Sequence, residues 1–163
     1  MIVNEITNIS TDIEAFDWVA DHLIKQDVQS KDNSGSCLYR GPDGTACAIG
    51  CLIADKNYEE WFETTATDDD YIIEAVSSSN PNWKIGSKQH HMLLVLQYIH
   101  DNYTPYTWEY DFESLKTVLF PDGENYDHDQ IISRVGVHLF SRDVKPFVQE
   151  AIALASEMKK SGV

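Results

Sequence analysis

Helical periodicity constrains the fold of this chain more than any other feature of its sequence. From Ser87 to Tyr103, apolar side chains recur every three or four residues, and Ser87 stands where a capping residue is expected. This spacing places the apolar side chains on one face of an α-helix, which then packs against a core. The residues of this inward stripe are Met92, Leu93, Leu96, Ile99 and Tyr103.

Similar patterns predict helices along most of the chain. Thr11 and Glu14 form a capping box at the start of the first helix, and Asp127 and Gln130 form a second candidate near the C-terminus. Thr107 is placed to cap the helix that follows the break at Pro105. The predicted helices cover residues 12–26, 58–62, 68–76, 87–103, 107–119 and 127–139, and a last helix starts near Ser141.

Residues 37–54 depart from this pattern. The run 37–40 is typical of a short strand, and Pro42 and Gly44 mark a tight turn after it. The stretch 47–54 predicts a short buried helix, in which Gly50 suggests that another backbone packs closely against it. We therefore predict an α+β fold, mainly α, with one small β-hairpin or strand–turn element near residues 37–45.

The length of 163 residues suits a single domain with one core. Residues 1–122 are expected to form the helical core with the β-hairpin, and residues 123–163 a C-terminal helical extension packed on the same domain. No apolar run is long enough to span a bilayer, and residues 1–10 lack the features of a signal peptide. The three cysteines lie close together and are odd in number, which predicts reduced thiols in a cytoplasmic protein.

Charge limits the possible partners. The chain has 27 acidic and 12 basic residues, a net charge of −15, so its field repels nucleic acid and anionic membranes. The acids concentrate in residues 55–74 and 101–129. Solvated helix faces would explain them; the other interpretation is an acidic surface that competes with nucleic acid for a basic protein partner. The candidate binding residues are Glu59, Glu60, Asp68, Asp69, Asp70, Glu74 and Arg40.

Metal and phosphate sites are not indicated. Cysteines and histidines are present, but the spacings Cys-x9-Cys and Cys-x3-Cys are not the short chelate pairs of zinc sites. The acids at 68–70 and 127–129 do not follow the order of ligands in a calcium loop. The glycines at 41–50 lack the order of a phosphate-binding loop. We therefore predict no metal and no cofactor.

A thiol nucleophile is the remaining catalytic hypothesis. Cys47 directly follows a turn at a predicted helix start, where amide groups and the helix dipole lower the pKa of a thiol. His100 and Asp101 could then serve as the base and the residue that orients it. The alternative is that Cys47 and Cys51 are small buried core residues and that His100 is a hydrogen-bonded packing residue. Both interpretations stay open from the sequence.

The stretches YRGPDGTACAIGCLIAD and LQYIHD carry a family resemblance. They resemble a family of small uncharacterised proteins of tailed bacteriophages and bacteria, in which a YRGPDG element with CA.GCLIPD precedes LQ..HD. The likeness extends over residues 11–120 and departs at Ala54, where the pattern has proline. The matching residues are Tyr39, Arg40, Gly41, Pro42, Asp43, Gly44, Cys47, Ala48, Gly50, Cys51, Leu52, Ile53, Asp55, Leu96, Gln97, His100 and Asp101.

The resemblance implies a phage or prophage setting and thus the host cytoplasm, but it brings no activity. Together with the charge it predicts a small acidic accessory protein that binds a host protein. An inhibitor of a defence factor or of a nucleic-acid-handling factor would fit this description. The alternative is a cysteine-dependent hydrolase or transferase that uses Cys47, His100 and Asp101. The sequence does not indicate an oligomeric state.

Overall fold

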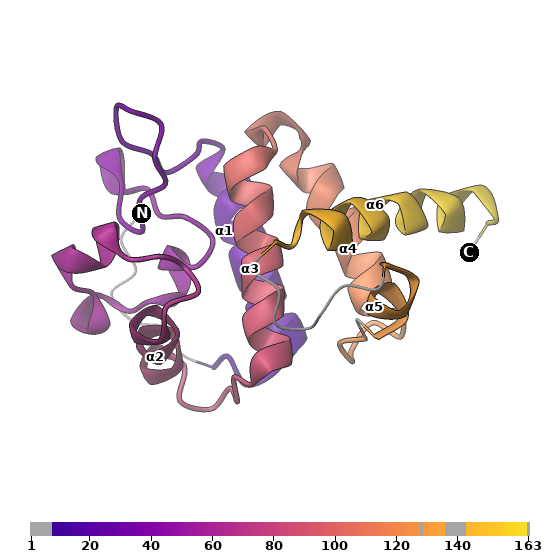
Figure 1. The fold of residues 1–163 in the computed structure, drawn as a ribbon, viewed down its shortest axis with the longest axis horizontal. Helices are drawn as coiled ribbons and strands as arrows, with labels where there is room; N and C mark the ends of the chain where they lie inside the picture. The colour runs from indigo at the N-terminus through magenta and orange to yellow at the C-terminus, as the bar shows by residue number, and fades with distance from the viewer. Residues whose placement is uncertain (1–7, 128, 136–142, 163) are drawn as a thin grey trace.

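The computed structural model describes residues 8–127, 129–135 and 143–162. Within them the chain folds into α-helices joined by loops and short 3₁₀ turns. The helices are α1 (Asp12–Gln26), α2 (Asp70–Ser79), α3 (Ser87–Asn102), α4 (Trp108–Leu119), α5 (Asp129–Val135) and α6 (Lys145–Lys160). In Figure 1, α1 and α3 occupy the middle, residues 27–69 and α2 lie on one side, and α4 to α6 lie on the other.

Helix α1 begins and ends at residues that the sequence marks for these positions. The Thr11 hydroxyl accepts a hydrogen bond from the Glu14 amide at 3.3 Å, as predicted for a capping box. The Glu14 carboxylate reaches one residue further back and accepts from the Ser10 amide at 3.2 Å. Phe16 on the buried face meets the ring of Phe120 edge to face at 5.5 Å, which joins α1 to the end of α4.

Helix α3 runs through the centre of the core. Four residues of the predicted apolar stripe are completely buried, namely Met92, Leu93, Leu96 and Ile99, whereas Tyr103, which follows the end of α3, is partly buried. The C-terminal half of α3 also buries two polar side chains, Gln97 and His100, so this helix brings hydrogen-bonding groups into the core as well. Buried polar groups need partners, and the partners of these two are Asp101 on α3 itself and groups of the segment that joins α1 to α2.

The C-terminal helices pack on the rest of the core. Helix α6 contacts α3, α4 and α5, and it buries an apolar face that includes Val148 and Ala155. The continuation of the predicted helix 127–139 beyond residue 135, and the predicted helix start near Ser141, lie outside the described residues. None of the described helices is long and apolar enough to cross a lipid bilayer.

The predicted β element is wrong. The described residues hold no strand, and the pairing near this region is a single antiparallel bridge between Lys31 and Cys37. The physical reason lies in the backbone partners of residues 39 and 40. Both amides donate to the carboxylate of Glu63, at 2.8 and 3.0 Å, and not to a neighbouring strand. The fold is therefore helical, and residues 37–45 are a loop that contains a 3₁₀ turn at Pro42–Gly44.

The short helix predicted at 47–54 is also wrong in form, although its burial is confirmed. Residues 47–54 are all buried, but they form one helical turn with a 3₁₀ segment at Gly50–Leu52. A Cβ atom on Gly50 would lie 2.3 Å from the carbonyl oxygen of Tyr39, so the predicted close approach of a second backbone is confirmed. The segment 47–54 thus packs tightly against the backbone of Tyr39 and does not form a regular α-helix.

Two helix starts in the acidic region differ from the prediction by about one turn or less. The helix predicted at 58–62 is a 3₁₀ segment at Glu60–Thr64. Helix α2 begins at Asp70, because the Asp69 carboxylate accepts from the Tyr71 amide at 2.9 Å and caps the helix there. The acids of the predicted helix start therefore lie at and just before the positive end of the helix.

Candidate functional site

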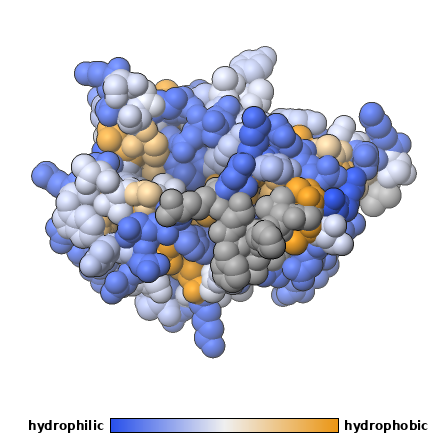
Figure 2. All heavy atoms as spheres, in the orientation of Figure 1, coloured by the Kyte–Doolittle hydropathy of each residue, from blue (hydrophilic) through white to orange (hydrophobic). Residues whose placement is uncertain are grey.

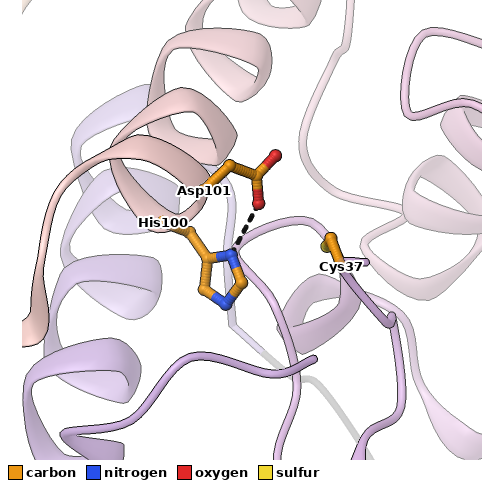
Figure 3. Close-up of side chains that lie close together, drawn as sticks. All are labelled: Cys37, His100 and Asp101. Carbon is orange, nitrogen blue, oxygen red and sulfur yellow. Dashed lines mark hydrogen bonds and ion pairs between the residues drawn. The ribbon is translucent and has the colours of Figure 1, made fainter. Parts of the chain in front are cut away.

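Two groups of residues bear on function, and the first is a cluster of Cys37, His100 and Asp101. His100 and Asp101 end the buried part of α3, and Cys37 comes from the loop that precedes Tyr39, as Figure 3 shows. One sulfur, one nitrogen and one oxygen atom of these residues lie within 4.8 Å of one another. His100 is fully buried, whereas Cys37 and Asp101 are partly exposed.

The structure brings together two of the three predicted catalytic residues. His100 Nδ1 and Asp101 Oδ1 are 2.8 Å apart, so neighbouring residues on one helix do pair here. The cysteine of the cluster is Cys37, however, and not the predicted Cys47, which is completely buried. Cys37 could not be chosen from the sequence, because its contact with α3 joins segments about 60 residues apart and no spacing rule encodes such a contact.

Hydrogen bonds fix the protonation of the His100 ring. The Ser30 amide donates to Nε2 at 2.9 Å, so Nε2 presents its lone pair to the backbone. Nδ1 then carries the hydrogen of the neutral ring and donates to Asp101. A general base needs a free lone pair directed at its substrate. Here that lone pair is used by Ser30, which gives His100 the role of a structural hydrogen-bonding residue.

Gln97 completes the network. Its amide nitrogen donates to Cys37 Sγ at 3.1 Å and to Asp101 Oδ1 at 2.9 Å. Its amide oxygen accepts from the Ile49 amide at 3.1 Å. One turn of α3 therefore holds the loop 29–38 and the buried segment 47–54 in place through side-chain hydrogen bonds. Gln97 was not among the predicted site residues.

The raised pKa of the Cys37 thiol also disfavours nucleophilic chemistry. The pKa of Cys37 is raised, first by its contact with the Cys47 thiol and next by burial, which outweigh the opposing effect of His100. Burial alone would lower the pKa of His100, but hydrogen bonds with Asp101 and Cys37 raise it overall. The Ser30 amide acts against protonation at Nε2. Since the thiolate is the reactive form, Cys37 is a weak nucleophile near neutral pH.

The cluster has the atom types of a metal site but not the required lone pairs. Thiolate, imidazole and carboxylate are all ligands of zinc. A metal on Nδ1 would require the ring hydrogen to move to Nε2, where it would face the Ser30 amide hydrogen. In zinc sites the second ring nitrogen usually donates to an acceptor, the reverse of this arrangement. In this hydrogen-bonding arrangement, Cys37, His100 and Asp101 therefore do not fit a metal ion.

Three surface cavities of the described residues lie away from this cluster. The described residues form cavities of about 430, 380 and 370 Å³, and none of these three is lined by a member of the Cys37 cluster. The last of them is lined by Arg40, a predicted binding residue. Its guanidinium donates to the Ile53 carbonyl at 2.6 Å, pairs with Asp55 at 3.1 Å and lies over the ring of Tyr58. Arg40 is thus committed to internal contacts.

The second group is a surface that we call the acidic–aromatic face. It centres on Trp61 and Tyr71, whose rings meet edge to face at 5.4 Å. Their side chains are 48% and 62% exposed, so this contact lies at the surface. The face consists of Glu59, Glu60, Trp61, Asp70, Tyr71 and Glu74.

Most of the predicted acidic binding residues belong to this face. Glu59 and Glu60 flank Trp61 in the chain, and Asp70 and Glu74 lie on α2 beside Tyr71; all four are exposed. Asp69 caps α2, and Asp68 lies half-buried before it. Trp61 was missed because the sequence pattern of 58–62 is equally consistent with its burial. Figure 2 shows one side of the molecule, on which hydrophilic residues dominate and apolar patches are small.

Searches against protein-family models, curated proteins and solved structures find no significant match to this chain. The function is therefore inferred from the chain's own residues.

Proposed function

We propose that this protein binds a basic segment of a partner protein on its acidic–aromatic face. The observation that carries this proposal is the pair Trp61 and Tyr71, which remain 48% and 62% exposed although both rings are held in edge contacts. Large aromatic side chains left at the surface mark interaction sites, and Trp and Tyr are prominent among residues that dominate binding energy.

Charge selects the partner. Exposed carboxylates lie next to the two aromatic residues in the chain and on α2, and the chain as a whole carries a net charge of −15. Such a field attracts a positively charged surface from a distance and repels nucleic acid. A protein that binds nucleic acid has a surface of the required sign, and occupying that surface would block it. The proposed function is therefore that of an acidic binding protein that competes with nucleic acid for its partner.

The biological setting is part of the proposal. The resemblance of residues 39–55 and 96–101 to phage and bacterial proteins would make the partner a bacterial host protein, such as a defence or nucleic-acid-handling factor. Under this proposal the protein acts by occupying a surface and needs no catalytic group. The hydrogen-bonded state of His100 and the raised pKa of Cys37 are consistent with that role.

The test is a comparison of matched charge variants. Wild-type protein, a face variant (Glu60→Gln, Asp70→Asn, Glu74→Gln) and a control variant (Glu109→Gln, Glu113→Gln, Glu124→Gln) are immobilised and exposed to bacterial lysate. Each variant loses three exposed carboxylates, one of them in the first turn of a helix. We expect basic proteins to be retained by the wild type and the control, to be lost from the face variant, and to elute as salt is raised.

A further variant separates the aromatic contribution from charge. Trp61→Ala with Tyr71→Ala keeps every carboxylate, so retention that depends on the whole face should fall in this variant too. Equal retention by the wild type and both face variants would refute the proposal, as would binding that does not depend on salt. If the face variant and the control variant lose retention equally, binding depends on the net charge and not on this face, and the proposal is refuted as well.

A further inference from the structure

The Trp61 ring is held in a fixed position at the surface. It packs edge to face against the buried Phe62 at 4.7 Å and against Tyr71 at 5.4 Å. The hydroxyl groups of Thr64 and Thr65 donate to the Trp61 carbonyl at 2.9 and 3.2 Å, which fixes its backbone. About half of the side chain stays exposed, at 48%. Little conformational entropy remains to be lost when a ligand stacks on this ring.

Among the described residues, no Lys or Arg side chain lies over the Trp61 ring. In the described residues, Lys and Arg side chains lie over three other aromatic rings: Arg40 over Tyr58, Lys88 over Tyr126 and Lys159 over Tyr110. None lies over Trp61 or Tyr71 in that part of the chain. Indole is the aromatic ring that attracts cations most strongly. The face thus combines an indole ring with neighbouring carboxylates and lacks only the cation.

The chain contains an internal example of the missing contact. The Arg40 guanidinium lies 5.1 Å from the ring centre of Tyr58 and pairs with the Asp55 carboxylate at 3.1 Å. Stacking and carboxylate pairing occur together because the guanidinium is planar and donates in its own plane, which leaves its faces free. An ammonium group has no such face. An aromatic ring flanked by carboxylates therefore offers more to arginine than to lysine.

We propose that the acidic–aromatic face recognises arginine side chains in preference to lysine, with Trp61 as the stacking surface and Glu60, Asp70 and Glu74 supplying the carboxylates. This inference rests on the proposed function and names the chemistry of its partner: a segment that presents arginine rather than lysine.

The test uses two synthetic peptides that differ only in the cation, alternating Arg-Ser and alternating Lys-Ser of equal length. Binding to the full-length protein is measured by calorimetry, and the Trp61 indole N–H resonance is followed by NMR. We expect the arginine peptide to bind about twofold to fivefold more tightly, the size of an exposed cation–π contact, and to shift the Trp61 resonance. Trp61→Leu should abolish this preference while leaving charge-driven binding of both peptides.

Two further variants make the result decisive. Trp61→Phe keeps an aromatic ring and should retain part of the preference, which controls for loss of packing in Trp61→Leu. The variant with Glu60→Gln, Asp70→Asn and Glu74→Gln should weaken both peptides. Equal wild-type affinity for the two peptides overturns the arginine inference but leaves the proposed function standing. A preference that survives in Trp61→Leu overturns the role of Trp61, and failure of both peptides to bind overturns the proposed function as well.

Discussion

The carbonyl oxygen of Tyr39 lies in the space that a side chain on Gly50 would occupy, 2.3 Å from the position of its Cβ atom. Real Cβ atoms do not come this close to backbone atoms, so Gly50→Ala must push the two segments apart. We expect a loss of about 2 to 3 kcal/mol in the free energy of unfolding, measured by chemical denaturation. Gly86→Ala is the control, because its Cβ would meet only a flexible glutamine side chain at 3.4 Å. Equal losses in both variants would contradict this account.

Glu63 is structural although it lies in the acidic segment. Its carboxylate accepts from the Tyr39 amide, the Arg40 amide and the Tyr58 hydroxyl, at 2.8, 3.0 and 2.6 Å. Glu63→Gln replaces one accepting oxygen by an NH₂ group, so we expect it to lower the free energy of unfolding by about 1 to 3 kcal/mol. Glu60→Gln, at an exposed position in the same turn, should change it by less than about 0.5 kcal/mol. A stable Glu63→Gln variant would argue against this role.

The His100 ring should be found as the Nδ1–H tautomer. The Ser30 amide donates to Nε2 and Asp101 accepts from Nδ1, so only this neutral form satisfies both contacts. Nitrogen NMR at a pH above the titration of the ring should show a protonated Nδ1 and a bare Nε2. His22, which places Nε2 3.4 Å from the Ala46 carbonyl, provides the opposite tautomer as an internal reference. A bare Nδ1 on His100 would reopen the metal and general-base hypotheses.

The cysteines should be slow to alkylate. The pKa of Cys37 is raised by the Cys47 thiol and by burial, and the pKa of Cys51 is raised by burial. Because iodoacetamide reacts with the thiolate, we expect Cys37 and Cys51 to react at least about tenfold more slowly at neutral pH than in unfolded protein. Cys47 should also react slowly, because it is completely buried and the reagent cannot reach it. Peptide mapping by mass spectrometry gives the rate for each residue. A faster reaction at Cys37 or Cys47 than in the unfolded chain would support the cysteine-dependent enzyme.

His22 should make the fold less stable in mild acid. Burial lowers the pKa of His22 below its ordinary value of 6.5. Above pH 6.5 the ring is neutral in both states, so its contribution is constant. As the pH falls below 6.5, the His22 ring binds a proton in the unfolded chain but stays neutral in the folded chain. The free energy of unfolding therefore declines until the pH reaches the lower pKa of His22 in the folded state.

A variant isolates this effect from other titrations. The difference in free energy of unfolding between wild type and His22→Gln should be constant above the ordinary histidine pKa and should shift against the wild type below it. A difference that does not change with pH would contradict the assignment to His22.

Helices were predictable from the sequence because their signals are local. Thr11 and Glu14, which form the cap of α1, are three positions apart, and the apolar residues of the stripe at 92–99 are spaced by a few positions, so capping and periodicity rules find α1 and α3 directly. The failures occurred where distant residues decide. Glu63 satisfies the amides of residues 39 and 40 across more than 20 positions, which removes the need for a partner strand. Cys37 meets α3 in the same non-local way.

The same difference applies to the candidate sites. The charge of the face could be predicted, since acids are visible as a composition bias at 59–74. The exposure of Trp61 could not, because an apolar ring in a short turn is buried or exposed according to what packs beside it. Phe62, its neighbour, points into the core, and the sequence does not distinguish the two rings.

The long segment between α1 and α2 consists of loops and short 3₁₀ turns and contains no α-helix. Its position depends on hydrogen bonds with side chains from other parts of the chain. Gln97 accepts from the Ile49 amide, His100 accepts from the Ser30 amide, and Asn80 donates to the Leu52 carbonyl. These bonds connect residues 28 to 70 positions apart, so each requires α2 or α3 to be in place before it can form. Folding is therefore expected to proceed in order, with the helices docking first and this segment, together with the Trp61 surface it carries, becoming structured last.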